Sequence, residues 1–334
     1  MSVLLYPEKQ IMNQKIQTIS DEVQQVIIGK RDVIEKLLMG ILAGGHILLD
    51  DVPGVGKTTL AVALGRVLGL RYRRVQFTPD VLPSDITGFS IYNSETGVFD
   101  YMPGVVTDAN ILLGDEINRT SSKTQSALLE AMEEGQVTVD GTTHPLRAPF
   151  IVIATQNNVG AAGTQLLPHA QLDRFLVRLS MGYPDYESQM EIIRGRQKKN
   201  PLDDVRKVCV TADVLQMQKE VLDVTVKSSI IAYITELTTA TRENPLAELG
   251  VSPRGALAIC RMAKARAYVY GRDYVVPEDV QAVFPDVCTH RIILSQKARI
   301  QEVTALQVLQ GAIAGIGVPD TPKKHRPMEK KDRI

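Results

Sequence analysis

The chain has 334 residues, of which 44% are hydrophobic and 23% are charged, as in an ordinary globular protein with a sizeable core. Lys and Arg total 38 and Asp and Glu total 38, so the net charge is zero, which argues against non-specific nucleic-acid binding because that needs a basic surface. The three cysteines form no C-x-x-C pair and no apolar run reaches about 18 residues, so we expect neither a disulfide framework nor a membrane span, but a reducing, cytoplasmic location.

Between about Ile41 and Met181, short apolar runs alternate with segments of helical spacing. The apolar runs lie at 46–50, 110–116, 150–157 and 175–181, and the helical segments include 57–69 and 122–134. Short apolar runs suit buried parallel strands, and their alternation with helices predicts an α/β domain.

Two stretches of this region have the pattern of β-hairpins. Residues 135–146 alternate apolar and polar positions around Asp140-Gly141, a strong two-residue turn signal. Residues 89–101 flank a polar, Gly-containing turn and give a weaker hairpin signal.

The second half of the chain is predicted to be helical, with breaks at Asn200-Pro201, Pro253 and Pro277. We therefore expect an α/β domain over 1–190, a smaller all-α domain over 191–318 and a charged, flexible tail over 319–334.

The segment DDVPGVGKTTL, residues 50–60, resembles the phosphate-loop pattern G-x-x-x-x-G-K-[ST] and lies between a predicted strand and a predicted helix. Backbone N–H groups at the start of the helix can wrap a phosphate, Lys57 can neutralise the β- and γ-phosphates of ATP, and Thr58 can offer a hydroxyl to Mg²⁺. The residues expected to contact the nucleotide are Pro53, Gly54, Val55, Gly56, Lys57, Thr58 and Thr59.

Asp51 stands where this pattern has its first glycine. The position lies at the strand end, before the loop wraps the phosphate, and its main demand is expected to be on backbone angles, which Asp tolerates better than most residues. An Asp side chain can also accept hydrogen bonds from nearby backbone N–H groups. We therefore expect the loop to hold phosphate.

The apolar strand ILLGDE, residues 111–116, ends in two acids at the carboxyl edge of the predicted sheet, where ligands bind in open α/β folds. Asp115 is expected to hold Mg²⁺ together with Thr58, and Glu116 to orient and activate the attacking water. An acidic strand end can also simply cap the helix that follows.

Five segments in this order resemble the MoxR family of AAA+ ATPases: VPGVGKTTL, LLGDEINRTSSKTQSALLEAMEEGQVTVDG, FIVIATQNN, LPHAQLDRFLVRL and SPRGALAI. The resemblance covers about residues 10–315. It implies a P-loop AAA+ core, a parallel sheet flanked by helices with β-hairpin insertions, followed by a smaller all-α lid. It also implies that the two hairpins are the helix-2 insertion and the pre-sensor-1 hairpin, which engage substrates in related machines.

The resemblance also implies roles for five further residues. Asn157 matches sensor 1, which helps to place the water; Arg174 matches the arginine finger, which reaches a neighbouring subunit's γ-phosphate; Arg254 matches sensor 2, which contacts the nucleotide from the lid; and Ile28-Gly29 matches the segment that packs on adenine. Without the family, Asn157 could form a turn, Arg174 could be a surface residue or pair with Asp173, Arg254 could begin a helix, and Ile28-Gly29 could be an ordinary turn.

As a whole, the resemblance implies Mg²⁺-dependent ATP hydrolysis between subunits of a ring, expected to be a hexamer. The implied role is chaperone-like: remodelling or maturing a protein client, often one with a von Willebrand factor A domain, in some relatives for metal insertion. The alternatives are a nucleotide-regulated binding switch with little turnover, and a metal-chelatase-like or DNA-acting AAA+ subunit. The zero net charge disfavours the DNA-acting role.

Overall fold

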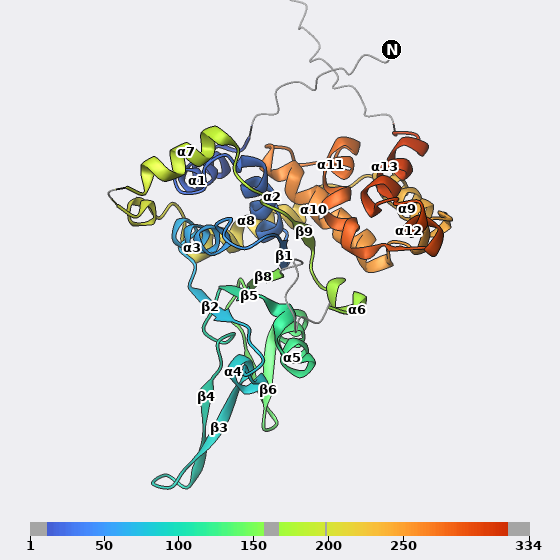
Figure 1. The fold of residues 1–334 in the computed structure, drawn as a ribbon. Helices are drawn as coiled ribbons and strands as arrows, with labels where there is room; N and C mark the ends of the chain where they lie inside the picture. The colour runs from blue at the N-terminus through green and yellow to red at the C-terminus, as the bar shows by residue number, and fades with distance from the viewer. Residues whose placement is uncertain (1–11, 157–166, 198, 320–334) are drawn as a thin grey trace, which may run out of the picture.

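A five-stranded parallel sheet forms the centre of the first half of the chain (Figure 1). The computed structural model describes residues 12–156, 167–197 and 199–319. Strand order is β2-β5-β8-β1-β9, and the strands span Tyr72–Gln76 (β2), Ile111–Asp115 (β5), Ile151–Gln156 (β8), Ile47–Asp50 (β1) and Val177–Leu179 (β9). The four apolar runs of the sequence are β1, β5, β8 and β9, so the predicted α/β fold is confirmed.

Alternation along the strands divides the core into two layers, because successive side chains point to opposite faces of a sheet. Ile47 and Leu49 of β1 face a cluster that includes residues of α1 (Gln14–Gln24), α2 (Arg31–Leu42) and α3 (Lys57–Val67). Leu48 faces the other cluster, which includes residues of α4 (Pro83–Thr87) and α5 (Ser122–Glu134). The sheet is thus covered on both faces, as a parallel sheet requires.

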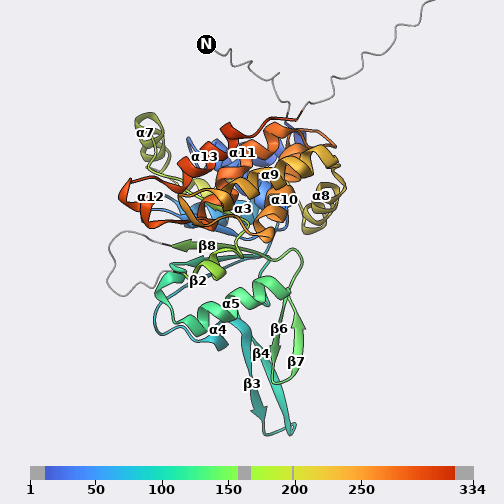
Figure 2. The same ribbon diagram turned by 90° about the vertical axis from the view of Figure 1, so that its right-hand side faces the viewer.

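Two antiparallel hairpins project from the same end of the molecule, as both views show (Figures 1 and 2). One pairs β3 (Gly88–Asn93) with β4 (Val98–Pro103), and the other pairs β6 (Gln136–Val139) with β7 (Thr142–Pro145). Both predicted hairpins are therefore confirmed. They touch through Tyr101 and His144, whose rings stack with centroids 3.7 Å apart.

The rest of the chain is mainly helical, and its helices begin where the prolines predict. Pro253 is the first residue of α10 and Pro277 the first of α11, the position where the missing N–H of proline costs nothing. The helices and short 3-10 turns are η1 (Ile117–Arg119), α6 (His169–Leu172), α7 (Tyr186–Gly195), η2 (Pro201–Asp204), α8 (Thr211–Asp223), α9 (Ser228–Glu243), α10 (Pro253–Val269), α11 (Pro277–Cys288), η3 (Thr289–Arg291), α12 (Gln296–Ile300) and α13 (Ala305–Gly315).

The helical part differs from the expected all-α domain by a two-stranded antiparallel sheet of β10 (Ala247–Leu249) and β11 (Ile293–Leu294). Its strands are two or three residues long and lie between helices, which is too short to leave a strand pattern in the sequence. Among the described residues, no helix is long and apolar enough to cross a membrane.

The helical part packs directly on the α/β part. Helix α8 contacts α2, α10 also contacts α2, and one continuous apolar cluster runs from Ile16 to Ala312. The expected domain boundary at 190/191 stays a proposal, and the apolar cluster extends across it. Most of the proposed tail, residues 320–334, lies outside the described residues.

Candidate functional site

The phosphate loop joins the end of β1 to the start of α3. Gly54 and Gly56 have φ values of +84° and +96°, a region where a side chain would strain the backbone, and Gly56 is the residue that precedes the first turn of α3. The loop therefore delivers its backbone N–H groups and the N-terminus of a helix to one place, which is a ready-made site for an anion.

Asp51 links this loop to the segment that follows β9. Its carboxylate accepts hydrogen bonds from the backbone N–H groups of Met181 and Gly182 and from the Ser180 hydroxyl, with a distance of 3.1 Å to Gly182 N and 3.2 Å to Ser180 Oγ. The expected reason for tolerating Asp here was wrong in part. Asp51 is not among the described non-glycine residues with positive φ, and the N–H groups it binds are about 130 residues away rather than nearby. What favours Asp is its acceptor oxygens, which bind the segment that follows β9.

Lys57 is held within its own loop. Its ammonium donates to the carbonyl oxygens of Asp51, at 3.0 Å, and Val52, at 3.3 Å. Burial lowers the pKa of Lys57, while the carboxylates of Asp51 and Asp115 act in the opposite direction. The surrounding acids thus favour the charged form that a phosphate needs.

A cavity of about 580 Å³ brings the loop and the acid pair together. Polar residues of both predicted motifs line one part of it and apolar residues line its other end. This mixture of polar and apolar lining is typical of small-molecule sites. The lining comprises Val26, Ile27, Ile28, Lys30, Pro53, Gly54, Val55, Gly56, Lys57, Thr58, Thr59, Arg74, Gln76, Asp115, Glu116, Thr155, Met181, Tyr183, Pro184, Gln189, Ile192 and Arg196. All the loop residues expected to contact nucleotide are among them.

The acid pair is positioned by the neighbouring strand β8. Glu116 has φ 57° and ψ 49°, a left-handed conformation that costs a non-glycine residue about 1–2 kcal/mol. Its N–H donates to Thr155 Oγ1 at 2.9 Å, and the Thr155 hydroxyl donates to Asp115 at 3.3 Å. Thr155 therefore holds both acids at the strand edge, and strain of this kind is often found at functional sites.

Mg²⁺ commonly binds proteins through one or two oxygen ligands and completes its shell with water and phosphate oxygens. Thr58 and Asp115 supply a hydroxyl and a carboxylate to the same cavity, which fits this mode. The described residues contain no group of three or more His, Cys, Asp or Glu side chains that could hold a metal by themselves, and this mode does not need one.

Three side chains at the acid pair were not predicted from the sequence. Arg74 Nε lies 2.7 Å from Asp115 Oδ2, Gln76 donates to Glu116 at 3.1 Å, and Arg119 lies 2.7 Å from the same Glu116 oxygen. Arg74 and Gln76 belong to β2, which pairs with β5 in a register that places Gln76 beside Asp115. No short motif carries this information; recognising YRRVQ as an edge strand would have been the necessary step.

The apolar end of the cavity contains Ile28, as the family resemblance implies for an adenine contact. Gly29, next in the chain, does not line the cavity but allows the close approach of α7, because a Cβ at Gly29 would lie 2.1 Å from Ser188 Oγ. Helix α7 in turn brings Gln189, Ile192 and its C-cap residue Arg196 to the cavity.

Arg174 and Arg254 lie elsewhere, in a second cavity of about 680 Å³ whose lining shares no residue with the first. Both bind the same carboxylate: Arg174 Nε lies 3.1 Å from Glu133, and Arg254 forms an ion pair with its other oxygen. The start of α10 lies beside the ends of α5 and α6, because Arg254 pairs with Glu133 and Ser252 bonds Asp173. The expected contact of Arg254 with nucleotide stays a prediction. Asn157 lies outside the described residues.

A parallel sheet whose strand edge carries a phosphate loop and an acid pair, followed by a helical lid, defines the AAA+ class of ATPases. In agreement, residues 46–177 match the family "ATPase family associated with various cellular activities (AAA)" and residues 239–311 match the "AAA lid domain".

Among relatives, the uncharacterized protein YeaC of Bacillus subtilis is 47% identical over 90% of this chain and 93% of its own. Chaperone MoxR1 of Mycobacterium tuberculosis is 39% identical over 89% and 81%. A crystal structure of a provisionally assigned ATPase from Cytophaga hutchinsonii superposes with a TM-score of 0.84 at 41% identity, covering 92% of this chain and 95% of that one. The chain belongs to the MoxR family of AAA+ ATPases.

Proposed function

We propose that the chain hydrolyses ATP to ADP and phosphate at sites shared between subunits of a ring, expected to be a hexamer, and uses the cycle to remodel a protein client. The observation that carries the proposal is a single cavity that gathers Lys57, Thr58, Asp115 and Glu116 from two separate parts of the sequence. Membership of an ATPase family with a chaperone among its relatives supports it.

Within one subunit, the residues have distinct parts in this proposal. The loop N–H groups and Lys57 bind the β- and γ-phosphates, while Ile28 and its apolar neighbours contact the base. Glu116 accepts a proton from, or orients, the water that attacks the γ-phosphorus, and Asn157 assists in placing that water. Mg²⁺, held by Thr58 and Asp115, would neutralise the charge of the phosphates.

The second half of the site comes from a neighbouring subunit in this proposal. Arg174 and Arg254 share Glu133 and line a different cavity from Lys57, which supports a role for both at the phosphates of another subunit. Both arginines would reach the γ-phosphate bound by the neighbouring subunit. An arginine finger supplied by a neighbour can raise the rate of hydrolysis by roughly 10³ to 10⁵.

The first test replaces Glu116 by glutamine. We expect Glu116→Gln to bind ATP with an affinity close to that of the wild type, because Lys57 and the loop are intact, while steady-state hydrolysis falls at least about 100-fold. Fluorescent-nucleotide titration and phosphate release measure the two quantities. Near-normal turnover of Glu116→Gln would remove Glu116 from its role.

The client and its chemistry are the finer part of the proposal. The hairpins, with exposed Tyr92 and Phe99 on β3–β4, would contact a protein that often carries a von Willebrand factor A domain, in some cases for metal insertion. The three cysteines are free, which supports a reducing, cytoplasmic location. Mass spectrometry of proteins captured by the Glu116→Gln variant with ATP, but not with ADP, would identify the client.

A further inference from the structure

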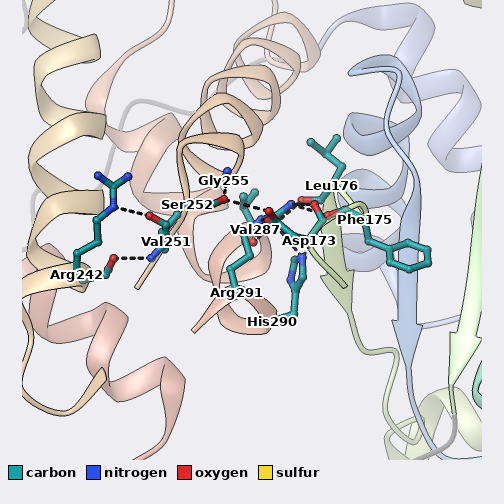
Figure 3. Close-up of polar contacts among 11 residues, drawn as sticks. Asp173, Phe175, Leu176, Arg242, Val251, Ser252, Gly255, Val287, His290 and Arg291 are labelled. Carbon is teal, nitrogen blue, oxygen red and sulfur yellow. Dashed lines mark hydrogen bonds and ion pairs between the residues drawn. The ribbon is translucent and has the colours of Figure 1, made fainter. Parts of the chain in front are cut away.

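Arg291, in the short turn η3 between α11 and β11, is almost fully buried, with 5% of its surface exposed. Figure 3 shows its guanidinium at the junction of the α/β part and the helical part, surrounded by oxygen atoms. A buried guanidinium is costly unless its donors are satisfied, so this environment has to be built around it.

The acceptors come mainly from one segment of the α/β part, residues 173–176, which follows α6. Arg291 Nε donates to the Asp173 carboxylate at 2.7 Å, and its terminal nitrogens donate to the carbonyl oxygens of Asp173 at 3.1 Å, Phe175 at 2.6 Å and Leu176 at 3.2 Å. One side chain of the helical part thus binds backbone carbonyl groups on both sides of Arg174.

The remaining contacts are within η3 and α11. Arg291 also donates to the carbonyl of Val287 and lies 2.8 Å from His290 Nε2. Burial lowers the pKa of His290 well below its ordinary value, and the charge of Arg291 acts in the same direction, so the imidazole is neutral; its Nε2 also lies 3.2 Å from the carbonyl oxygen of Phe175. Five oxygen acceptors match the five N–H donors of Arg291: the carboxylate and carbonyl of Asp173 and the carbonyls of Phe175, Leu176 and Val287.

Asp173 also forms a hydrogen bond with the residue that precedes α10. Its second carboxylate oxygen accepts a hydrogen bond from the Ser252 hydroxyl at 3.1 Å, and Ser252 Oγ accepts from the N–H of Gly255 at 3.1 Å as the N-cap of α10. Arg254 lies between these two residues. Asp173 therefore links Arg291, which binds the backbone around Arg174, to Ser252, the N-cap of α10 two residues before Arg254.

We propose that Arg291 is a positioning residue for ATP hydrolysis: it holds Arg174 and Arg254 as one two-arginine unit that is presented to the neighbouring subunit. The inference rests on the proposed function and goes beyond it, because it assigns the geometry of the shared site to a buried residue that touches no nucleotide. Glu133, which binds both arginines in the single chain, occupies them until the phosphates of the neighbour compete for them.

The test replaces Arg291 by lysine, which keeps the charge but has three donors on one nitrogen and cannot follow a planar fork. We expect kcat to fall roughly 10- to 100-fold, the range for a misplacement of about 1 Å, with KM and the affinity for ATP within about twofold of the wild type. The matched control is Arg272→Lys, also in the helical part and paired with the buried Asp279, which lacks contacts to residues 173–176 and should keep the wild-type kcat.

Mixing experiments separate positioning from general damage. Rings that combine Arg291→Lys with Glu116→Gln should regain activity, because the first contributes an intact phosphate pocket and the second an intact arginine pair. Rings that combine Arg291→Lys with Arg174→Ala should not, because both lack that pair.

The combination of Arg174→Ala with Glu116→Gln tests the proposed function by itself. If this mixture regains nothing, the shared site is wrong. If it regains activity while Arg291→Lys keeps the wild-type kcat, or while Arg291→Lys with Glu116→Gln stays inactive, the positioning role of Arg291 is overturned.

If Arg291→Lys does not fold, Ser252→Ala tests the same connection at a half-buried position. Ser252→Ala should lower kcat severalfold, and rings that combine it with Glu116→Gln should regain activity. Ser295→Ala, which removes the equivalent N-cap of α12, should leave kcat unchanged. Equal kcat values for these two cap variants would contradict the proposal.

Discussion

Asp51 illustrates how one residue can depart from a motif without loss of its geometry. The glycine of the phosphate-loop pattern is replaced by a side chain that binds two backbone N–H groups and a hydroxyl beyond β9. The carboxylate therefore joins the loop to the segment that leads into α7, and α7 lines the far side of the cavity.

Restoring the motif with Asp51→Gly should therefore destabilise the protein. Three donors would lose their acceptor, which we expect to cost about 1–3 kcal/mol of the free energy of unfolding. Urea denaturation measures the loss, and Asp51→Asn, which keeps one acceptor oxygen, should lose less. An unchanged unfolding midpoint for Asp51→Gly would show that these bonds contribute nothing.

The residues of the site divide according to what determines their positions. Lys57, Thr58, Asp115 and Glu116 could be predicted to meet, because each lies at the carboxyl end of a parallel strand or just beyond it, and such ends share one edge. Arg74, Gln76 and Thr155 could not, because their approach depends on the register of β2 and β8 against β5, which no local pattern encodes. Arg291 meets residues 173–176 across more than 100 positions of sequence.

At the scale of elements, prediction succeeded where local chemistry decides the structure. The Asp140-Gly141 turn has φ values of 49° and 77°, the left-handed pair that an Asp-Gly dipeptide favours in a hairpin. Strand β2 was missed because YRRVQ is at the sheet edge, where arginines can extend into solvent, and an edge strand needs no apolar run.

The β3–β4 hairpin carries apolar side chains that the fold does not need. Phe99 is 70% exposed, whereas Phe77 is fully buried against β5 and α5. We expect Phe99→Ala to change the free energy of unfolding by less than about 0.5 kcal/mol, and the control Phe77→Ala to reduce it by about 3–5 kcal/mol. Chemical denaturation compares the two. A loss at Phe99 as large as that at Phe77 would mean that the hairpin is part of the core rather than a free surface.

For the whole molecule, the continuous apolar cluster between the α/β part and the helical part has a mechanical consequence. A boundary with its own buried core on each side would allow the lid to swing freely, but here α8 and α10 both rest on α2. Together with the Arg291 network, this packing joins the start of α10 to residues 173–176. We therefore expect the arginine pair to move with the α/β part of its own subunit.

The separation of the two cavities leads to a prediction about concentration. If the phosphates bind at Lys57 and the arginine pair lies in another cavity, a single subunit has an incomplete site. The rate of hydrolysis per chain should therefore fall as dilution dissociates the ring into monomers. We expect a decrease of at least about 100-fold, since the finger supplies roughly 10³ or more of the rate. Phosphate release across a dilution series, beside sedimentation at the same concentrations, should give coincident midpoints. ATP binding per chain should stay constant over that range, because Lys57, Thr58 and Asp115 belong to one subunit. Full-rate hydrolysis by dilute monomers would place the whole reaction within a single chain.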